Sequence, residues 1–551
     1  MAEQTFEESL LDELRAIDSF RRRYASDQPA ARIDAHDPDV QRLIEVLAFS
    51  AVRTRQALRN NLRDTWRRLL GSYFEPLLSP LPAMALVEAQ VTARMSESAF
   101  LPAGTEVQAV AADGFVGCFQ TLSDLRIVPM TLERCETLRA PHGMRLVLTF
   151  QSRLPRTDSV GVLRLGVHYL DDYLAALTVH QQLKAHLVRA FVLYDAPVHE
   201  GADGPRCQVE FGPTYDEPYT ADERNPLLAV RSFFHFPQQE LLIHVTVPPA
   251  PRPWTRLSIC LDMAPDWPRR PAPFRELFRP FVVPVRNIRR APAQPILCDG
   301  TQDSYPISFV HADASYRLHT VDGVYRITAD GLVPIPLATL HSAAPSYELE
   351  QRLRPGPAAA EAEETPALLL RIPRALIDPV QILVEGQWHQ PHLAQHLTGA
   401  LSITLPDRTL LGVDLALVGP VRWGLQPQLG RDAAALLRLL SLKMKAVLDL
   451  DELRALLTLL ESTDQGPFRG FLARVRELAI ETAPDETLRG AGLRHIYHLL
   501  VPDPPSEEAP MWDCFCSQLQ RLLDAWNYEG RSEVVRHSDP ARLPDGRLRR
   551  R

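Results

Sequence analysis

Three histidines in the second half of the chain are the best candidates for metal chemistry. His389, His392 and His396 follow one another at spacings of three and four residues, which would place three imidazoles on one helical face. Pro391 lies inside this run, however, and no Asp, Glu or Cys within it completes a set of ligands. We therefore interpret the three histidines as structural or surface residues, and we predict no metal and no cofactor.

Other reactive side chains are not arranged for catalysis. Asp171 and Asp172 are adjacent, so on a helix they would point about 100° apart, and we expect a solvated loop or helix start there. Cys514 and Cys516 are too close in sequence for the usual zinc pair. The odd total of seven cysteines indicates free thiols. Common nucleophile, metalloprotease and phosphate-loop motifs are absent, so we predict that the protein is not an enzyme.

The composition narrows the class of protein. A chain of 551 residues with 45% hydrophobic residues is expected to form two to four domains. Its formal net charge of −8 implies no general attraction to nucleic acid. It contains no run of 18 apolar residues and starts with an acidic segment rather than a secretory signal, so we expect a cytoplasmic protein without membrane insertion. The 48 prolines indicate many short extended segments.

The chain is organised around a long predicted helix that begins near Asp37. Asp37 is a suitable N-cap, Pro38 suits the first helical position, and Gly71 provides a stop. About 33 helical residues would span about 50 Å, a length more typical of an assembly strut than of a catalytic scaffold. One apolar stripe runs along it: Val40, Ile44, Leu47, Ala51, Leu58, Leu62, Trp66, Leu69 and Tyr73.

The remaining patterns predict an α+β fold. A first helix over about 4–25 should pair with the long helix as a hairpin, and short alternating segments after it predict β-sandwich-like domains. A strand is expected over 84–91 and a helix within 169–195. Leucine-rich helices near the end, one of which opens with Asp449 and Glu452 in the spacing of a capping box, give a mixed, helix-rich C-terminal domain. The predicted units are a helical region at 1–80, a first β-rich domain at 81–260, a second at 261–354 and the C-terminal domain at 355–551.

Several motifs resemble the TssF family, a baseplate subunit of bacterial type VI secretion. They are DPDVQRLIEVLAF at 37–49, YFEP at 73–76, PAMALVE at 82–88 and LPAGT at 101–105, in the family's order. FFHFPQQELL at 233–242 and YRLHTVDGVY at 316–325 resemble later segments of the family. The resemblance is strongest over 37–133.

The resemblance implies a structural subunit of a baseplate wedge in a contractile injection machine. Its expected partners are a second copy of the chain, a TssG-like subunit, TssK, TssE with the sheath base, and the spike protein. The expected location is a cytoplasmic baseplate docked near the inner membrane. Two alternatives remain open at this point. One is the equivalent subunit of another phage-tail-like contractile particle, and the other is a soluble carbohydrate-binding β-protein or enzyme.

Candidate interface residues lie mainly on the long helix. Leu43, Val46, Phe49 and Val52 are apolar yet lie off the main stripe, which indicates an apolar face broader than one neighbouring helix requires. Arg59, Arg63 and Arg67 recur every four residues and form a basic ridge. Two interpretations stay open: a solvated face, since exposed charge pairs contribute only about 0–1 kcal/mol, or a surface that meets an acidic surface of a second subunit.

The C-terminus departs from the family pattern. The family usually has a further strand before its final helix, and here residues 502–510 leave no room for it, so we expect a short proline-rich loop leading to a helix over about 511–528. The apolar side of that helix should be packed, because leaving it in water forfeits about 25 cal/mol per Å². Trp512 and Phe515 on this side are the last two predicted interface residues.

Overall fold

The computed structural model describes most of the chain. The described residues are 6–27, 37–141, 143–212, 226–268, 274–310, 315–338, 345–355, 362–372, 378–397, 399, 401–425, 433–460, 466–484, 492–501, 506–527 and 530–540. They contain both helices and sheets, as expected for the α+β class.

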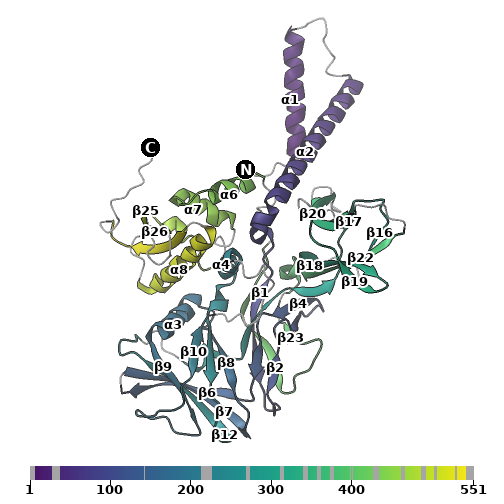
Figure 1. The fold of residues 1–551 in the computed structure, drawn as a ribbon. Helices are drawn as coiled ribbons and strands as arrows, with labels where there is room; N and C mark the ends of the chain where they lie inside the picture. Colours follow the sequence, from purple (N-terminus) through teal and green to yellow (C-terminus); the bar gives the residue numbers. More distant parts are fainter. Residues whose placement is uncertain are drawn as a thin grey trace.

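Two helices project from the body of the molecule (Figure 1). They are α1 (Phe6–Asp27) and α2 (Pro38–Leu78). Asp37 begins α2 as predicted, because its carboxylate accepts a 2.9 Å hydrogen bond from the backbone N–H of Asp39. We use the term helix pair for α1 together with the outer part of α2, residues 38–62.

The predicted end of α2 near Gly71 was wrong. The helix continues to Leu78 and contains a single non-helical residue, Phe74, with φ −120° and ψ 16°. Pro76 explains the position of this kink, because proline has no N–H to donate to the carbonyl four residues earlier and its ring crowds that carbonyl. The helix therefore bends just before the proline instead of ending there.

After α2 the chain enters a closed six-stranded barrel. The first strand has the predicted bounds, but it does not show the alternation of a half-buried strand. Its first six residues are all buried, because its two faces pack into two different apolar clusters. The barrel strands, in order around the barrel, are β1 (Met84–Val91), β14 (Val282–Arg286), β4 (Val116–Thr121), β3 (Glu106–Val110), β23 (Ser402–Thr404) and β24 (Val413–Arg422). The short strands β2 (Ala99–Leu101) and β5 (Leu125–Ile127) pair beside it.

Two four-stranded sheets follow, and their apolar side chains belong to the same buried core. One sheet contains β6 (Thr131–Ala140), β7 (Gly143–Arg156), β12 (Trp254–Met263) and β9 (Leu187–Tyr194), and the other contains β10 (Gln208–Phe211), β11 (Leu242–Val247), β8 (Gly161–Val167) and β13 (Phe278–Pro280). The helices of this region are α3 (Tyr173–His186) and α4 (Pro226–His235). The helix predicted within 169–195 therefore ends at His186, and β9 follows it directly.

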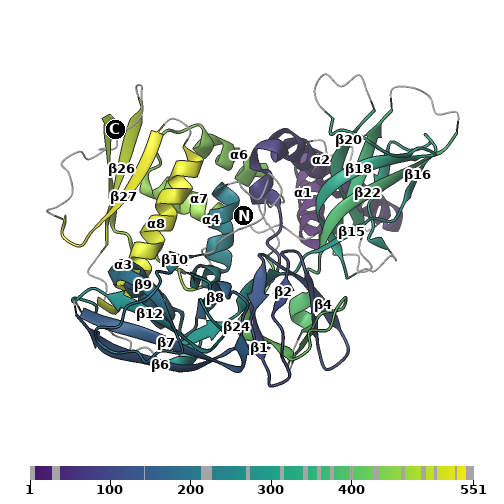
Figure 2. The same ribbon diagram turned by 60° about the horizontal axis from the view of Figure 1, so that its bottom comes forward.

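A second β-domain extends over residues 289–389 and has its own core around Phe309, Leu368 and Trp388. Its strands are β15 (Arg289–Pro292), β22 (Val380–His389), β18 (Arg317–Thr328) and β19 (Gly331–Pro334), with β16 (Ile296–Cys298) on β22, and a smaller sheet of β17 (Ser304–Pro306), β21 (Ala362–Arg371) and β20 (Ser346–Pro355). The short helix α5 (Leu393–His396) follows β22. Strand β20 of this domain lies beside α2, as Figure 2 shows.

Two buried amides fasten the second β-domain to the barrel. Asn287 and Gln390 lie where the chain leaves the barrel and where it returns. Gln390 N–H donates to the Asn287 side chain at 2.7 Å, and Asn287 Nδ2 donates to Gln390 Oε1 at 3.0 Å. The same two side chains also bond to the backbone of Val116 and Cys118 in β4. We call Asn287 and Gln390 the amide clamp.

The C-terminal domain combines helices with a three-stranded sheet. Its elements are α6 (Ala433–Lys443), α7 (Leu450–Leu459), α8 (Ala509–Trp526), β25 (Glu477–Pro484), β26 (Leu493–Leu500) and β27 (Gly530–His537). The predicted Asp449–Glu452 capping box is present in α7. The sequence did not predict β27, which follows α8 and pairs in parallel with β26. Helix α8 is thus the crossover connection that parallel pairing requires.

The barrel joins distant parts of the sequence. Its strands come from residues 84–121, 282–286 and 402–422, so the predicted boundaries at residues 260 and 354 do not separate the sheets in space. The physical reason is that strand pairing closes the barrel with segments inserted between its strands, which local sequence patterns do not reveal. The division of the chain into four units remains a prediction.

Candidate interaction surface

Exposed apolar side chains are concentrated on the helix pair. Of the 25 large hydrophobic side chains exposed in the described part of the chain, nine lie on these two helices. On α1 they are Leu11, Phe20 and Tyr24, and on α2 they are Leu43, Val46, Leu47, Phe49, Leu58 and Leu62. Single exposed apolar residues are ordinary, whereas a gathering of this size on one projection is typical of a surface that another protein covers.

The contact between α1 and α2 uses only part of the apolar surface of α2. Ala48 and Val52 are buried at 0% and 1% exposure, four residues apart on one side of the helix. Phe6 packs edge to face on Phe49 with ring centroids 5.4 Å apart. Glu13 in α1 and Arg55 in α2 form an ion pair at 2.9 Å. Outside this contact Leu43, Val46 and Leu47 stay more than half exposed.

The structure divides the four predicted apolar interface residues into two groups. Leu43 and Val46 are 60% and 63% exposed, and Phe49 is 46% exposed although it touches Phe6. Val52, in contrast, is buried within the helix pair, so it presents no surface to a partner. Leu47, assigned to the main stripe that should face α1, is 54% exposed. The packed side of α2 is therefore rotated from the predicted stripe, toward Ala48 and Val52.

The predicted basic ridge runs from the last turn of the outer part of α2 into the segment before the kink. The side chains of Arg59, Arg63 and Arg67 lie outside the described residues, so their partners stay a prediction. Arg55, one turn before the ridge, is the arginine whose ion pair with α1 is described.

Trp512 and Phe515 are 0% exposed and lie in the interior of this chain. They belong to a cluster of aromatic rings that joins α4, α8 and the segment 466–474. Within it Trp512 contacts Phe471 at 4.6 Å, and Phe234 contacts both Phe468 and Phe515. In this conformation the two residues offer no surface to a partner, and any effect on assembly would act through the stability and position of the C-terminal domain.

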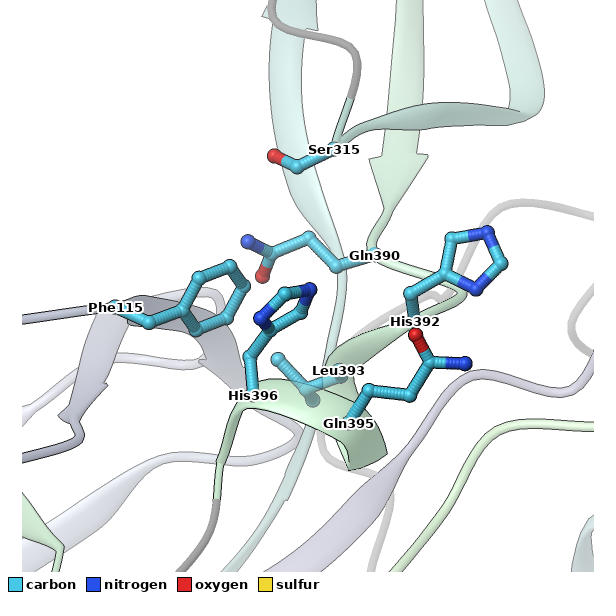
Figure 3. Close-up of a pocket in the computed structure, with 7 residues that line it drawn as sticks. All are labelled: Phe115, Ser315, Gln390, His392, Leu393, Gln395 and His396. Atoms are coloured by element: carbon cyan, nitrogen blue, oxygen red, sulfur yellow. The ribbon is translucent and has the colours of Figure 1, made fainter. Parts of the chain in front are cut away.

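The histidine run does not form a metal site in this arrangement. His389 is buried in β22, and its burial lowers the pKa to about 4. His396 stacks on Phe115 with ring centroids 4.5 Å apart, and Figure 3 shows its ring facing Phe115 while the ring of His392 points away. His392 and His396 both line a hollow of about 310 Å³ beside the barrel. No group of three or more His, Cys, Asp or Glu side chains in the described residues is placed to hold a metal ion.

The remaining reactive side chains have structural surroundings. Asp172 is the N-cap of α3, since its carboxylate accepts a 3.1 Å hydrogen bond from the backbone N–H of Ala175. All seven cysteines are free thiols, as predicted. Burial raises the pKa of both Cys514 and Cys516 to about 12, which keeps these thiols protonated and unreactive near neutral pH.

Sequence reasoning missed part of the exposed surface. Phe20 and Tyr24, four residues apart on α1, stack on each other with ring centroids 6.0 Å apart and are 68% and 41% exposed. The helical period identifies an apolar stripe but not which part of it a short partner helix covers.

None of the described helices is long and apolar enough to cross a membrane.

Comparisons with known proteins agree with this architecture. The family model described as "Type VI secretion system, TssF" matches residues 11–354. A chain in the cryo-electron microscopy structure of the type VI secretion system TssK-TssF-TssG baseplate subcomplex is 16% identical, with a TM-score of 0.70 over 91% of this chain and 97% of that one. A chain of the type VI secretion baseplate complex is also 16% identical, with a TM-score of 0.61 over 97% of each chain. No curated protein sequence matches the chain.

Proposed function

The chain belongs to the TssF family of the type VI secretion system, and we propose that it is a structural subunit of the baseplate wedge. The family match covers more than half of the chain, and the fold agrees with solved baseplate chains over nearly its whole length. On this proposal the protein works by holding other subunits in place and not by catalysis.

We propose a TssG-like subunit and TssK as its direct partners. The solved chain that it resembles forms a subcomplex with TssK and TssG. The family resemblance further suggests a second copy of the chain, TssE with the sheath base, and the spike protein as neighbours. The proposed location is a cytoplasmic baseplate docked near the inner membrane.

The observation that carries the proposal is the apolar surface of the helix pair. Leu43 and Val46 lie one turn apart on α2 and are both more than half exposed. A helix that presents apolar side chains three and four residues apart is suited to a helical or grooved protein surface. We propose that the TssG-like subunit covers this surface, and that doing so removes the apolar side chains from water.

Co-expression with the TssG-like subunit tests the proposal. The wild-type chain should co-purify with that subunit at a fixed stoichiometry, and addition of TssK should give a larger particle. A chain that is monomeric and well folded, yet binds neither subunit at micromolar concentrations, would contradict the proposal.

A further inference from the structure

The two parts of α2 lie in different surroundings. Before the kink, the helix pair stands in solvent, away from the body (Figure 1). After the kink, Phe74 and Leu77 are each 2% exposed and belong to the main core. The lower part of α2 is therefore fixed, and the direction of the helix pair depends on how the chain bends at Phe74.

The backbone alone provides little to fix that bend. Pro76 lacks an N–H group, so straightening the helix would not restore the hydrogen bond that proline removes. Phe74 already has non-helical φ and ψ angles. Proline weakens the helix at this point, so the side chains packed around Phe74 contribute to the direction of the bend.

The C-terminal domain supplies the packing at the kink. Phe74 stacks on Trp526, the last residue of α8, with ring centroids 6.4 Å apart and planes 19° apart. Trp526 is itself held from α6: its Nε1 donates to the carbonyl of Leu442 at 3.4 Å, and the Lys443 ammonium lies 4.8 Å from its ring centroid and donates to its carbonyl oxygen. The ring that receives Phe74 is thus fixed by a second helix, and α6 also packs against α2.

The end of α2 is held independently of this contact. Arg231 in α4 is 1% exposed and donates to the carbonyl of Ser79 at 2.6 Å. His235 Nε2 lies 3.0 Å from the carbonyl of Pro82. These bonds fix the chain below the kink, and so the contact between Phe74 and Trp526 is where the C-terminal domain acts on the kink itself.

We propose that Trp526 is a positioning residue, which holds the kink at Phe74 and so couples the C-terminal domain to the direction of the helix pair. Phe74 and Trp526, 452 positions apart in sequence, then set the geometry of one surface. A shift of α8 or α6 would turn the helix pair relative to the barrel. The proposal rests on the proposed function only for what the helix pair binds, because the coupling itself is a property of this chain alone.

Distance measurements on the purified full chain test the coupling. Spin labels carried by genetically encoded amino acids at positions 45 and 154 report on the outer helix and the β-sheet body, since both sites are exposed. The wild type should give one narrow distance distribution between the labels. Trp526→Ala should widen it and shift its mean, whereas Trp526→Phe, which keeps a ring in place, should stay close to the wild type.

Trp512→Ala is the matched control for Trp526→Ala. Trp512 lies in the same helix and is fully buried, but its described ring contacts are with Phe471 and Phe515 rather than with α2. A general loosening of α8 would affect both tryptophan variants, whereas the coupling predicts a change of distance for Trp526 alone. If Trp526→Ala fails to fold, Phe74→Leu removes the other ring and should widen the distribution in the same way.

A narrow, unshifted distribution in both Trp526→Ala and Phe74→Leu would overturn the coupling. Equal widening in Trp512→Ala would also overturn it. Because the isolated chain is measured, neither result depends on whether a TssG-like subunit binds, so failure of the coupling and failure of the proposed function are distinguishable.

Discussion

The ring of Phe6 in α1 meets the ring of Phe49 in α2 edge to face, with the ring centroids 5.4 Å apart. Phe49 therefore has two roles that a substitution would mix. It stabilises the contact between the two helices, and its exposed part, 46% of the residue, is available to a partner. An assembly experiment needs a neighbouring residue without the internal contact.

Val46 is that residue, because it is 63% exposed and lies one turn from Phe49. We predict that Val46→Asp weakens binding to the TssG-like subunit by about 1–3 kcal/mol, the scale of losing a contributing side chain of an interface. The free energy of unfolding should change by less than about 0.5 kcal/mol. Titration calorimetry and chemical denaturation measure the two quantities.

Val188→Asp is the control for Val46→Asp, since Val188 is 68% exposed on β9, far from the helix pair in sequence. Phe49→Asp should weaken assembly by several kcal/mol and also destabilise the helix pair, because the contact with Phe6 is lost. If Val46→Asp binds as tightly as Val188→Asp, the exposed face of α2 is not the interface.

The basic ridge gives a prediction about rate. Reversing the charge of Arg59, Arg63 and Arg67 together to Glu should slow association with an acidic partner surface at low ionic strength. At about 1 M salt, where the Debye length falls to about 3 Å, the difference from the wild type should disappear. Stopped-flow association at several salt concentrations measures this. Equal rates at low salt would mean that the ridge is only solvated.

The amide clamp should show strong energetic coupling. Asn287→Ala or Gln390→Ala alone leaves the other buried amide with lost hydrogen bonds, at a cost of about 1–3 kcal/mol each. The double variant should cost less than the sum of the two, because the second substitution removes a group that is already unsatisfied. Denaturation of the four proteins gives the cycle. Additive effects would show that the two amides act independently.

The sequence predicted individual helices and strands better than it predicted how they pack together. The bounds of β1, the N-cap Asp37 and the capping box of α7 all follow from local rules, and the structure confirms them. The apolar side of α8 was predicted correctly as well, because its helical period is strong and Trp512, Phe515 and Trp526 are large.

The errors concern contacts between distant parts of the chain. Val52 was predicted to lie off the packed stripe. It is buried instead, because α1 covers only part of α2 and lies on the side of Ala48. The barrel was missed because its strands come from three separate segments. β27 was missed because it pairs with β26 across α8, a pairing that no local pattern records.

Buried imidazoles should make the fold sensitive to acid. His180, His235 and His244 are each less than 10% exposed, and burial lowers the pKa of each from 6.5 to about 4. Between those pH values the unfolded chain binds more protons than the folded chain, so the free energy of unfolding falls as the pH falls from about 6.5 to about 4. Each group contributes up to about 3 kcal/mol of this loss.

A single substitution checks the acid prediction. His235→Gln removes one buried group that must lose its proton for the chain to fold. The free energy of unfolding of this variant should therefore depend less on pH than that of the wild type. His396→Gln changes an exposed histidine and is the control. Denaturant titrations at pH 7, 6, 5 and 4 give the slope for each protein. A wild-type stability that stays constant from pH 7 to pH 4 would contradict the assignment of neutral buried imidazoles.

The C-terminal helix gives the last prediction. Removing residues 511–551 would expose the rings of Phe234, Phe468 and Phe471, which pack on Trp512 and Phe515, and would remove β27 from its sheet. It would also leave Phe74 without Trp526. The truncated chain should therefore aggregate or lose its C-terminal domain, and assembly with the TssG-like subunit should be abolished.

A point variant separates stability from assembly at this helix. Trp512→Ala should lower the free energy of unfolding by about 3–5 kcal/mol, the usual cost of deleting a fully buried aromatic ring. Trp512→Phe should cost less, because it keeps an apolar ring in the cluster. Because Trp512 is internal, its substitution should affect assembly only through the loss of the fold. Wedge formation at low temperature should therefore follow the folded fraction of each variant. A truncated chain that stays soluble and joins the wedge would show instead that α8 is dispensable.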